Sequence, residues 1–192
     1  MPSKARKIVI QLVSLALIFG QVSAAEPGKP ADSSKGADSK KWDVSVPHLP
    51  SDTVQFETSE GTWISVDVRP DGKQIVFDLV GDIFTLPIEG GTATLLSGGL
   101  PYEIQPRYSP DGKKILFTSD RGGGDNIWMM DADGSNRVQI TKEDYRLLNN
   151  GIWHPKQPYI VARKHFTSER SLGAGEMWMY HIPDGGSGIQ LT

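Results

Sequence analysis

The sequence predicts an all-β fold, namely a partial β-propeller of about three four-stranded blades preceded by an orphan strand. The first observation is a repeat, because three stretches share one pattern anchored on Pro70, Pro110 and Pro155. The second is the period, since these prolines lie 40 and 45 residues apart, the length of a propeller blade. The third is local. Short runs rich in Ile, Val, Phe and Trp alternate with Gly, Pro, Asp and Asn, which is typical of strands and turns.

Each unit divides into four expected strands, named a to d in chain order, with strand a before the anchor proline. The other strands are expected at 74–78, 114–119 and 159–163 (b), 83–86, 127–131 and 177–181 (c), and 94–96, 138–141 and 188–192 (d). In units one and two, Pro-Asp-Gly joins strands a and b. Proline presets φ, aspartate bonds the backbone two residues on, and glycine accepts a positive φ. The third unit has Lys156 and Gln157 in place of Asp-Gly, so a different turn is expected there.

A lone strand is expected ahead of the repeats. Residues 53–58 lie where a strand d would precede unit one, without strands a to c of their own. Propellers close into rings of about four to eight blades, whereas three blades leave an unprotected sheet edge. We therefore expect the N-terminal part of a longer polypeptide, whose last blade the orphan strand completes. Closure by association of short chains is the alternative, and the open edge predicts poor solubility or self-association.

The N-terminus has the features of an export signal. Lys4, Arg6 and Lys7 precede an apolar run over residues 8–20, and small residues at 22–25 fit a cleavage site. The run is shorter than the roughly 20 residues that span a bilayer. We therefore predict a cleaved signal peptide at 1–25, a flexible tether at 26–50, and the β-propeller repeats of an incomplete ring at 51–192. The protein is then periplasmic or secreted.

Charge and composition limit the partners. The formal net charge is −3, and loss of residues 1–25 removes three cations and no anion, which argues against nucleic acid or an anionic membrane as the main partner. No stable membrane insertion is expected after signal cleavage. The absence of cysteine excludes disulfides and thiol chemistry. The expected partner is a downstream domain of the same polypeptide or a periplasmic protein.

The sequence shows no catalytic or metal-binding constellation. The four histidines, His48, His154, His165 and His181, lack metal-ligand spacing, and no nucleophile elbow occurs. We therefore predict no catalytic, cofactor-binding or metal-binding residue in this segment, and no hydrolase activity from these residues alone. Because it aligns with turn positions of the other units, His154 is interpreted as a turn residue.

Three local patterns have both a functional and a structural interpretation. Residues 131–136 resemble the start of a calcium loop, but the EF-hand spacing fails and a hairpin turn is favoured. Residues 121–125 suggest a phosphate-binding loop, but a plain b–c connection is favoured because the Lys-Ser/Thr and the helix are missing. Phe84, Trp128 and Trp178 share one position of strand c, where packing is favoured over a ligand-stacking box.

A small basic cluster lies on the long b–c connection of unit three. Arg163, Lys164 and Arg170, joined by His165 when protonated and partly offset by Glu169, fall near residues 164–175. Loops on a rigid scaffold often bind ligands, so contact with an anion or acidic partner is one interpretation. A solvated loop is the favoured one, because exposed charges are the norm.

The pattern of unit two resembles the repeats of TolB-type β-propellers. The segments that carry the resemblance are 109–113, 117–120, 126–128, 133–134 and 140–141, and the likeness extends over residues 53–192. The resemblance implies the fold, whereas one fold hosts many functions.

A narrower resemblance concerns exported proteins that join such a propeller to a C-terminal metal-dependent amidohydrolase. It is carried by residues 57–63, 78–83, 162–164 and 170–176. The resemblance implies a non-catalytic segment here and a catalytic domain, with the metal-binding His-x-His motif, beyond residue 192. The alternatives are a periplasmic TolB-like protein-binding module and the propeller of a serine peptidase. TolB-type modules carry an α/β domain before the propeller, where this chain has only the tether.

Overall fold

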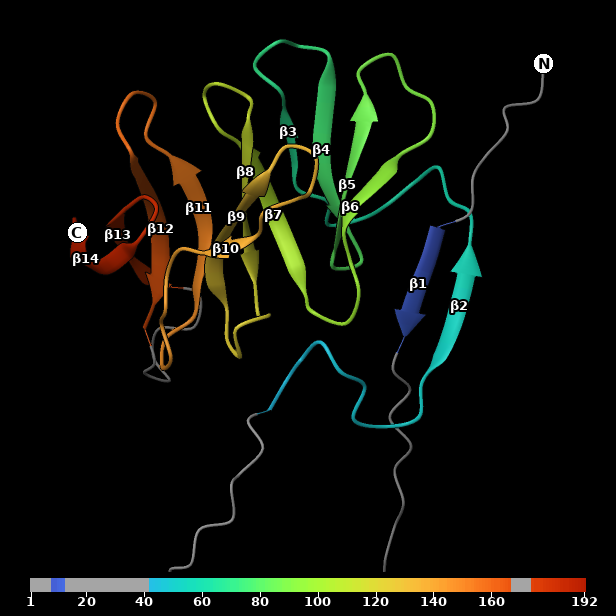
Figure 1. Ribbon diagram of the computed structural model, residues 1–192, viewed down its shortest axis with the longest axis horizontal. Coiled ribbons are helices and arrows are strands. Elements are labelled where there is room, and N and C mark those ends of the chain that lie inside the picture. Colours follow the sequence, from blue (N-terminus) through green and yellow to red (C-terminus); the bar gives the residue numbers. More distant parts are fainter. Residues whose placement is uncertain (1–7, 13–41, 167–173) are drawn as a thin grey trace, which may run out of the picture.

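The structure is an array of three β-sheets that stand side by side like the blades of a fan (Figure 1). It is a computed structural model that describes residues 8–12, 42–166 and 174–192. All regular elements in these residues are strands, in three four-stranded antiparallel sheets and one separate pair. The predicted all-β partial propeller is thereby confirmed.

Each blade follows the predicted order, because strands adjacent in the chain are adjacent in the sheet. Blade 1 contains β3 (Val66–Val68), β4 (Gln74–Leu79), β5 (Asp82–Pro87) and β6 (Thr94–Ser97). Blade 2 contains β7 (Glu103–Tyr108), β8 (Lys114–Ser119), β9 (Asn126–Asp131) and β10 (Val138–Gln139). Blade 3 contains β11 (Leu148–Trp153), β12 (Tyr159–His165), β13 (Gly175–His181) and β14 (Gly185–Gln190). The last strand begins three residues earlier than expected.

The orphan strand exists as β2 (Asp52–Phe56) and pairs with a segment near the N-terminus. Its antiparallel partner is β1 (Ile8–Leu12), which lies within the predicted signal peptide. The cleavage site and most of the tether lie outside the described residues, so the signal peptide and its boundaries stay predictions. In the parts of the chain that the structure describes, no helix has the length and apolar character to cross a bilayer.

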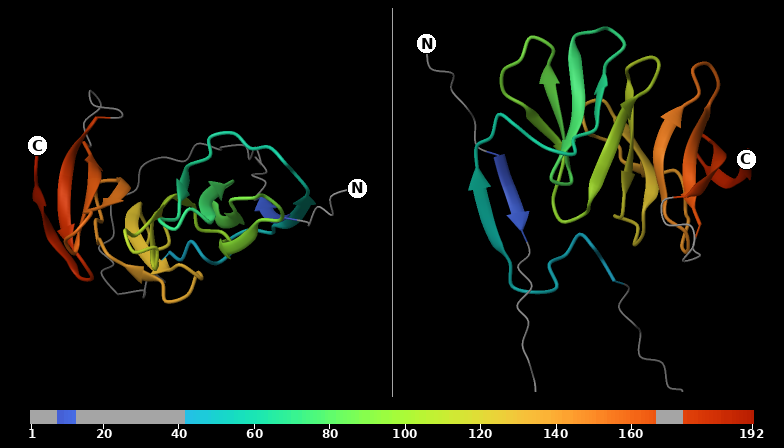
Figure 2. Two further views of the ribbon diagram at one scale, coloured as in Figure 1. Left: turned by 90° about the horizontal axis from the view of Figure 1, so that it is seen from above. Right: turned by 180° about the vertical axis from the view of Figure 1, so that it is seen from behind.

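Side-chain alternation gives every blade two packing faces. In blade 2, Ile115 and Phe117 face blade 1, whereas Leu116 faces blade 3. Two cores result, one between each pair of neighbouring blades. The side-by-side arrangement of the blades is seen from two further directions in Figure 2. The first core contains Val76, Ile83, Tyr108, Ile115, Phe117 and Met130, and the second contains Leu116, Ile127, Met129, Ile140, Leu148, Ile160, Ala162 and Tyr180.

The two outer faces of the array carry apolar rows that no described blade covers. Cross-strand partners form one row on each face, because paired residues of antiparallel strands point to the same side. The row on blade 1 is Val66, Phe77, Phe84 and Leu95, and the row on blade 3 is Ile152, Val161, Met179 and Ile189. The terminal residues of both rows are exposed, so these faces suit further blades.

The turns between strands a and b explain the anchor motif. In blade 2 the Ser109 hydroxyl donates to Asp111 Oδ1 at 2.6 Å and accepts the Lys114 amide at 2.9 Å. In blade 3, where Asp-Gly is missing, His154 Nδ1 accepts the amides of Lys156 and Gln157 at 3.2 and 2.9 Å. The expected difference in the third turn and the assignment of His154 as a turn residue are both confirmed.

The glycine between strands c and d has a role beyond its turn. Gly134 has φ +86°, and a Cβ there would lie 2.7 Å from the Leu96 carbonyl oxygen of blade 1. At Gly185, the corresponding residue of blade 3, a Cβ would lie even closer to the Ile140 carbonyl oxygen of blade 2. The missing side chain at each glycine thus leaves room, here called the glycine notch, for the backbone at strand d of the preceding blade. Gly90 of blade 1 has φ +89° with nothing within 4 Å.

This notch predicts unequal effects of alanine at two similar turns. Both Gly90→Ala and Gly134→Ala place a Cβ at positive φ, which costs roughly 1–2 kcal/mol. Gly134→Ala also pushes against a backbone carbonyl, so its free energy of unfolding should fall by at least about 2 kcal/mol more. Urea denaturation of the two variants measures this difference. Equal losses would show that the notch does not hold blade 2 against blade 1.

Candidate functional site

A shallow hollow lies where the ends of the three strands a converge. Its volume is about 290 Å³. Strands β3, β7 and β11, which contact one another in sequence, bring the anchor prolines of all three units to it. Its lining residues are Asp67, Val68, Pro70, Arg107, Tyr108, Ser109, Pro110, Ile152, Trp153 and Pro155. The repeated motif therefore builds one shared surface.

Hydrogen bonds between blades fix the wall of this hollow. The Tyr108 hydroxyl donates to Gln74 Oε1 at 3.0 Å, and the Tyr108 amide donates to Asp67 Oδ2 at 2.8 Å. Burial raises the pKa of Tyr108 to about 12, so the hydroxyl is a neutral donor at physiological pH. Trp153 Nε1 donates to the Arg107 carbonyl at 3.0 Å. Tyr108 of blade 2 is thereby hydrogen-bonded to blade 1, and Trp153 of blade 3 to blade 2.

Arg107 gives the hollow its positive charge. One terminal nitrogen of its half-buried guanidinium donates to the carbonyls of Pro106 and Val66, at 2.8 and 3.3 Å. The fork geometry of arginine suits further carbonyl or carboxylate oxygens. The hydroxyl of Ser109 is occupied by its turn, and the lining contains no histidine. The hollow is therefore suited to binding, and it lacks the nucleophile–base pair of a hydrolase.

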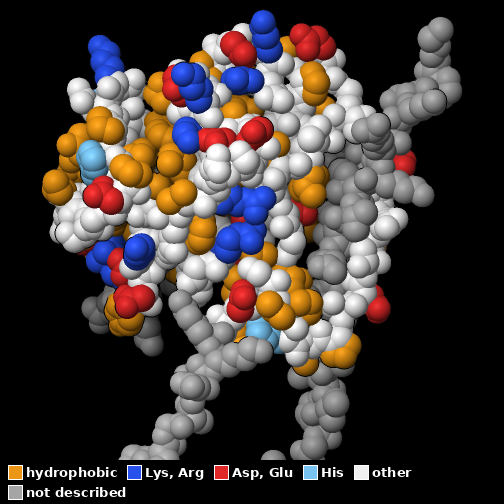
Figure 3. All heavy atoms as spheres, viewed as in Figure 1, with side chains coloured by type: hydrophobic (Ala, Val, Ile, Leu, Met, Phe, Trp, Pro, Cys, Tyr) orange, Lys and Arg blue, Asp and Glu red, His pale blue; other side chains and the backbone are white. Residues whose placement is uncertain are grey.

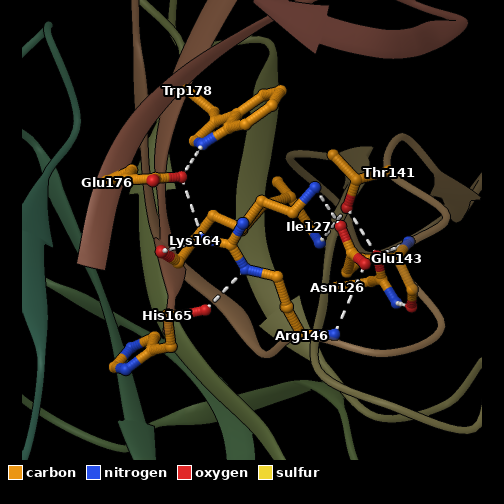
Figure 4. Close-up of polar contacts among 9 residues, drawn as sticks. All are labelled: Asn126, Ile127, Thr141, Glu143, Arg146, Lys164, His165, Glu176 and Trp178. Atoms are coloured by element: carbon orange, nitrogen blue, oxygen red, sulfur yellow. Dashed lines mark hydrogen bonds and ion pairs between the residues drawn. The ribbon is translucent and has the colours of Figure 1, made fainter. Parts of the chain in front are cut away.

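A second polar cluster joins blades 2 and 3 at the opposite end of the sheets (Figure 4). Asn126, the first residue of strand c, accepts the Thr141 hydroxyl and the Glu143 amide at 2.8 Å each. Its own amide group donates to the Glu143 carbonyl at 2.8 Å. The Asn126 side chain thus provides hydrogen-bond partners for the backbone of the linker that leads from blade 2 to blade 3.

Charged residues complete this joint. Arg146 donates to the His165 carbonyl at 2.8 Å and pairs with Glu176 at 2.9 Å (Figure 4). Hydrogen bonds from Trp178 and Arg146 hold the pKa of Glu176 below its usual value. Lys164 pairs with Glu143 and lies 4.3 Å from the Trp178 ring centroid. The linker is thereby held against strands b and c of blade 3.

The structure corrects the favoured interpretation of the basic cluster. The Lys164 side chain is only 13% exposed and belongs to the joint, so the solvated loop is wrong for this residue. Burial, followed by the charge of Arg163, lowers the pKa of His165, whose Nε2 lies 3.1 Å from Asn149 Oδ1. The described residues of the basic cluster therefore do not form a surface for binding an anion. Glu169 and Arg170 lie outside the described residues.

Blade 1 carries an acid where blade 2 has Asn126. Asp82 is 6% exposed and accepts the Gly99 amide at 3.1 Å. Burial raises its pKa to about 6, and the nearby Glu103 adds to the rise. Glu103 is fully buried and pairs with Arg121 at 2.8 Å. Sequence reasoning missed the shared role of Asp82, Asn126 and Glu176, although each lies at the start of a strand c, as the first residue of β5 and β9 and the second of β13.

The other patterns are structural. Carboxylates of the suspected calcium loop accept Asn136 Nδ2 at 2.6 Å and the Ser135 amide at 2.9 Å, which confirms the hairpin turn. Residues 121–125 connect β8 and β9 without a helix. Phe84 stacks on Phe77, while Trp128 and Trp178 pack on the cores, so packing is confirmed. The described part of the chain places no three His, Asp or Glu residues where they can hold a metal.

The repeated four-stranded blades and the shared surface at their strand-a ends define a β-propeller module. A model of the TolB beta propeller domain matches residues 38–178, which is well over half of the chain. The chain therefore belongs to the TolB beta propeller domain family.

Known proteins with similar sequence are much longer than this match. Protein Atu1656 of Agrobacterium fabrum, which is uncharacterized, is 39% identical over 90 residues, 45% of this chain and 29% of that protein. A candidate Tricorn-like protease C-terminal subunit of Sulfurisphaera tokodaii is 26% identical over 146 residues, 76% and 16% of the two chains. The Tol-Pal system protein TolB of Wolinella succinogenes is 31% identical over 85 residues, which are 42% of this chain and 20% of that protein. The matched part is therefore less than a third of each relative.

Solved structures share the fold. A candidate TolB from Agrobacterium tumefaciens has a TM-score of 0.58 at 23% identity, over 77% of this chain and 58% of that one. Puromycin hydrolase has a TM-score of 0.52 at 16% identity, over 73% of this chain and 23% of that one. These likenesses concern the propeller architecture.

The raised pKa of Asp82 predicts a pH-dependent stability. Because the native state holds this proton more tightly than the unfolded chain, the free energy of unfolding should fall as pH rises from about 4 to about 6. Asp82→Asn should remove this part of the slope and add about 2 kcal/mol above pH 7. Urea denaturation at several pH values checks it, with the exposed Asp71→Asn as control. Parallel curves for wild type and Asp82→Asn would contradict the assignment.

The reverse exchange in blade 2 should have the opposite effect. Asn126→Asp loses the donor to the Glu143 carbonyl and buries a charge, so stability at pH 7 should fall by at least about 2 kcal/mol. The loss should shrink near pH 5, where the new acid is protonated. Thermal unfolding at both pH values measures it, and a loss independent of pH would argue against a buried carboxylate there.

Proposed function

We propose that the chain is the non-catalytic propeller segment of an exported protein. In this proposal it is the N-terminal part of a metal-dependent amidohydrolase whose catalytic domain lies beyond residue 192. The sequence resemblance to exported propeller–amidohydrolase proteins supports this. The lengths of the relatives agree with it, since the chain spans 16% to 29% of the curated relatives described above.

The observation that carries the proposal is where the resembling residues lie. Asp78 accepts the Ser65 amide at 2.8 Å within blade 1 and the Gln105 amide of blade 2 at 2.6 Å. Asp82, from the same segment, accepts the Gly99 amide of the linker after blade 1, and Glu176, from another resembling segment, pairs with the linker side chain of Arg146. The likeness therefore includes the contacts that set how one blade joins the next. Shared joints support a shared ring, which is a stronger basis than shared surface residues.

In this function the propeller is a rigid module that gates or positions substrate. The hollow offers Arg107, Trp153 and three prolines for contacts with a substrate that carries carbonyl or carboxylate groups. The metal, which activates water for attack on an amide, would be held by the downstream domain. The described residues contain no suitable ligand cluster and are assigned no part in the chemistry.

Export to the periplasm or beyond is part of the proposal, and its support is the N-terminal charge and apolar pattern. The partner is the downstream domain of the same polypeptide. A periplasmic TolB-like module that binds proteins is the alternative without catalysis, favoured by the likeness to the Wolinella succinogenes TolB.

A serine peptidase is the second candidate for the whole protein. It is favoured by the relative from Sulfurisphaera tokodaii described above, which is named for a Tricorn-like protease. It makes the same use of the propeller and differs in the chemistry beyond residue 192.

The full-length gene product distinguishes these candidates. For an amidohydrolase, the purified protein should contain about one or two bound metal ions per chain, lose amide hydrolysis on chelation and regain it with Zn²⁺. For a serine peptidase, a fluorophosphonate should label it and chelation should leave activity unchanged. The 192-residue chain alone should turn over neither amides nor esters, which serves as the control. Labelling without a metal requirement would overturn the amidohydrolase in favour of the peptidase.

A further inference from the structure

The guanidinium of Arg107, in the hollow at the strand-a ends, has donors that the blades leave unused. One terminal nitrogen donates to the carbonyls of Pro106 and Val66, at 2.8 and 3.3 Å, which holds the partly buried side chain in place. Among the residues that the structure describes, its Nε and its other terminal nitrogen have no hydrogen-bond or ion-pair partner. These two nitrogens form the fork that matches a planar carboxylate.

The acids around the hollow are already satisfied. Asp67 accepts two backbone amides, at 3.0 Å through Oδ1 and at 2.8 Å through Oδ2. On the adjoining turn, Asp71 pairs with Arg69 at 3.7 Å. Asp67 and Arg107 are the two charged residues of the lining, so an incoming monoanion pairs with the guanidinium. A dianion such as a phosphate monoester would place excess negative charge beside Asp67.

The wider surface mixes charges of both signs. On the face seen in Figure 3, cationic and anionic side chains are interspersed among the described residues. The whole chain has a formal net charge of −3. Long polyanions gain their affinity by contacting many cations along a continuous basic surface. This distribution of charge therefore favours a small ligand for Arg107, one that brings a single carboxylate.

The rest of the hollow is largely apolar. Val68 is 49% exposed, and Trp153 and the three anchor prolines belong to the same lining. Within this lining, every side-chain donor apart from Arg107 is already hydrogen-bonded inside the blades. The volume of about 290 Å³ is small for a ligand site. The hollow therefore suits one residue that joins a carboxylate to an apolar group.

A carboxylate can come from the end of a peptide or from an acidic side chain. At the C-terminus of a peptide, the carboxylate and the last side chain leave the same carbon atom, so both reach one small hollow. In aspartate and glutamate the carboxylate is the tip of the side chain, and the polar backbone follows it. The apolar lining around Arg107 therefore favours the chain end.

We propose that the hollow at the strand-a ends binds the free carboxylate and the apolar side chain of a C-terminal residue. Arg107 receives the carboxylate through Nε and its unengaged terminal nitrogen, while Val68 and Trp153 contact the side chain. This deepens the proposed function and rests on it, since the bound residue is then the end of the substrate. Arg107 selects the substrate and takes no part in breaking the amide bond.

Isothermal titration calorimetry of the full-length gene product tests the ligand class, with N-acetyl-leucine as the probe. N-acetyl-leucinamide differs by the lost charge and should bind at least about tenfold more weakly. The α-amide of N-acetylglutamate presents a side-chain carboxylate without the apolar group, and it should also bind at least about tenfold more weakly. Equal binding of the leucinamide overturns the role of the carboxylate. Equal binding of the glutamate derivative overturns the choice of a chain end.

Variants of two arginines locate the binding. Arg107→Gln keeps a donor for the two carbonyls and removes the charge, so N-acetyl-leucine should bind as weakly as its amide. Arg137→Gln is the matched control, because Arg137 also donates to a carbonyl of a neighbouring blade but lies outside the hollow, and it should leave binding unchanged.

A third variant keeps the test decisive if Arg107→Gln does not fold. Arg107→Lys retains the charge and a donor but loses the fork, so binding of N-acetyl-leucine should weaken at least about fivefold. A preference for the carboxylate that persists unchanged in the Arg107 variants places the binding elsewhere and overturns the site.

Kinetics separate failure of this site from failure of the proposed function. Where the full-length protein hydrolyses amides, Arg107→Gln should raise KM for substrates with a free C-terminal carboxylate more than it lowers kcat. Binding of N-acetyl-leucine through Arg107 without any amide hydrolysis overturns the proposed function and leaves the site standing. Amide hydrolysis with the same KM for a carboxylate substrate and its carboxamide overturns the site alone.

Discussion

Packing between neighbouring blades is the interaction on which the whole structure depends. A single sheet of this size cannot bury both faces, and successive residues of strand b point to opposite blades. Leu116 and Phe117 are adjacent in sequence and contribute to different cores. At roughly 1.5–3 kcal/mol for each large buried side chain, these two cores provide most of the favourable energy. Blade 2 is covered on both sides, which is why all side chains from Ile115 to Ser119 are buried.

The polar joints follow from the same packing. Bringing two blades together buries the linker between them, and its backbone groups then need partners. Asn126 meets this need with a neutral amide that both donates and accepts. Asp82 can only accept when ionised, and it lies near the buried Glu103. The two joints therefore share one architecture and differ in how well the buried group is satisfied.

Local patterns predicted the strands and turns well, because periodicity and turn chemistry reside within a few consecutive residues. The Ser109 turn and the substitute turn at His154 are examples. Contacts between units were not predictable. The pairing of Lys164 with Glu143 joins residues 21 positions apart across a linker, so the exposure of Lys164 was misjudged. The hollow also escaped sequence reasoning, since its lining comes from three separate units.

The glycine notch has a consequence for how such arrays change in length. At Gly134 the contact is with a backbone carbonyl of the preceding strand d, a group that every residue possesses. The side chains of that strand are therefore free to vary without disturbing the fit. A duplicated unit brings its own notch and finds an acceptable neighbour wherever it is inserted. A unit gained or lost by recombination therefore keeps this backbone contact at the new junction, where only the side-chain core has to be fitted again.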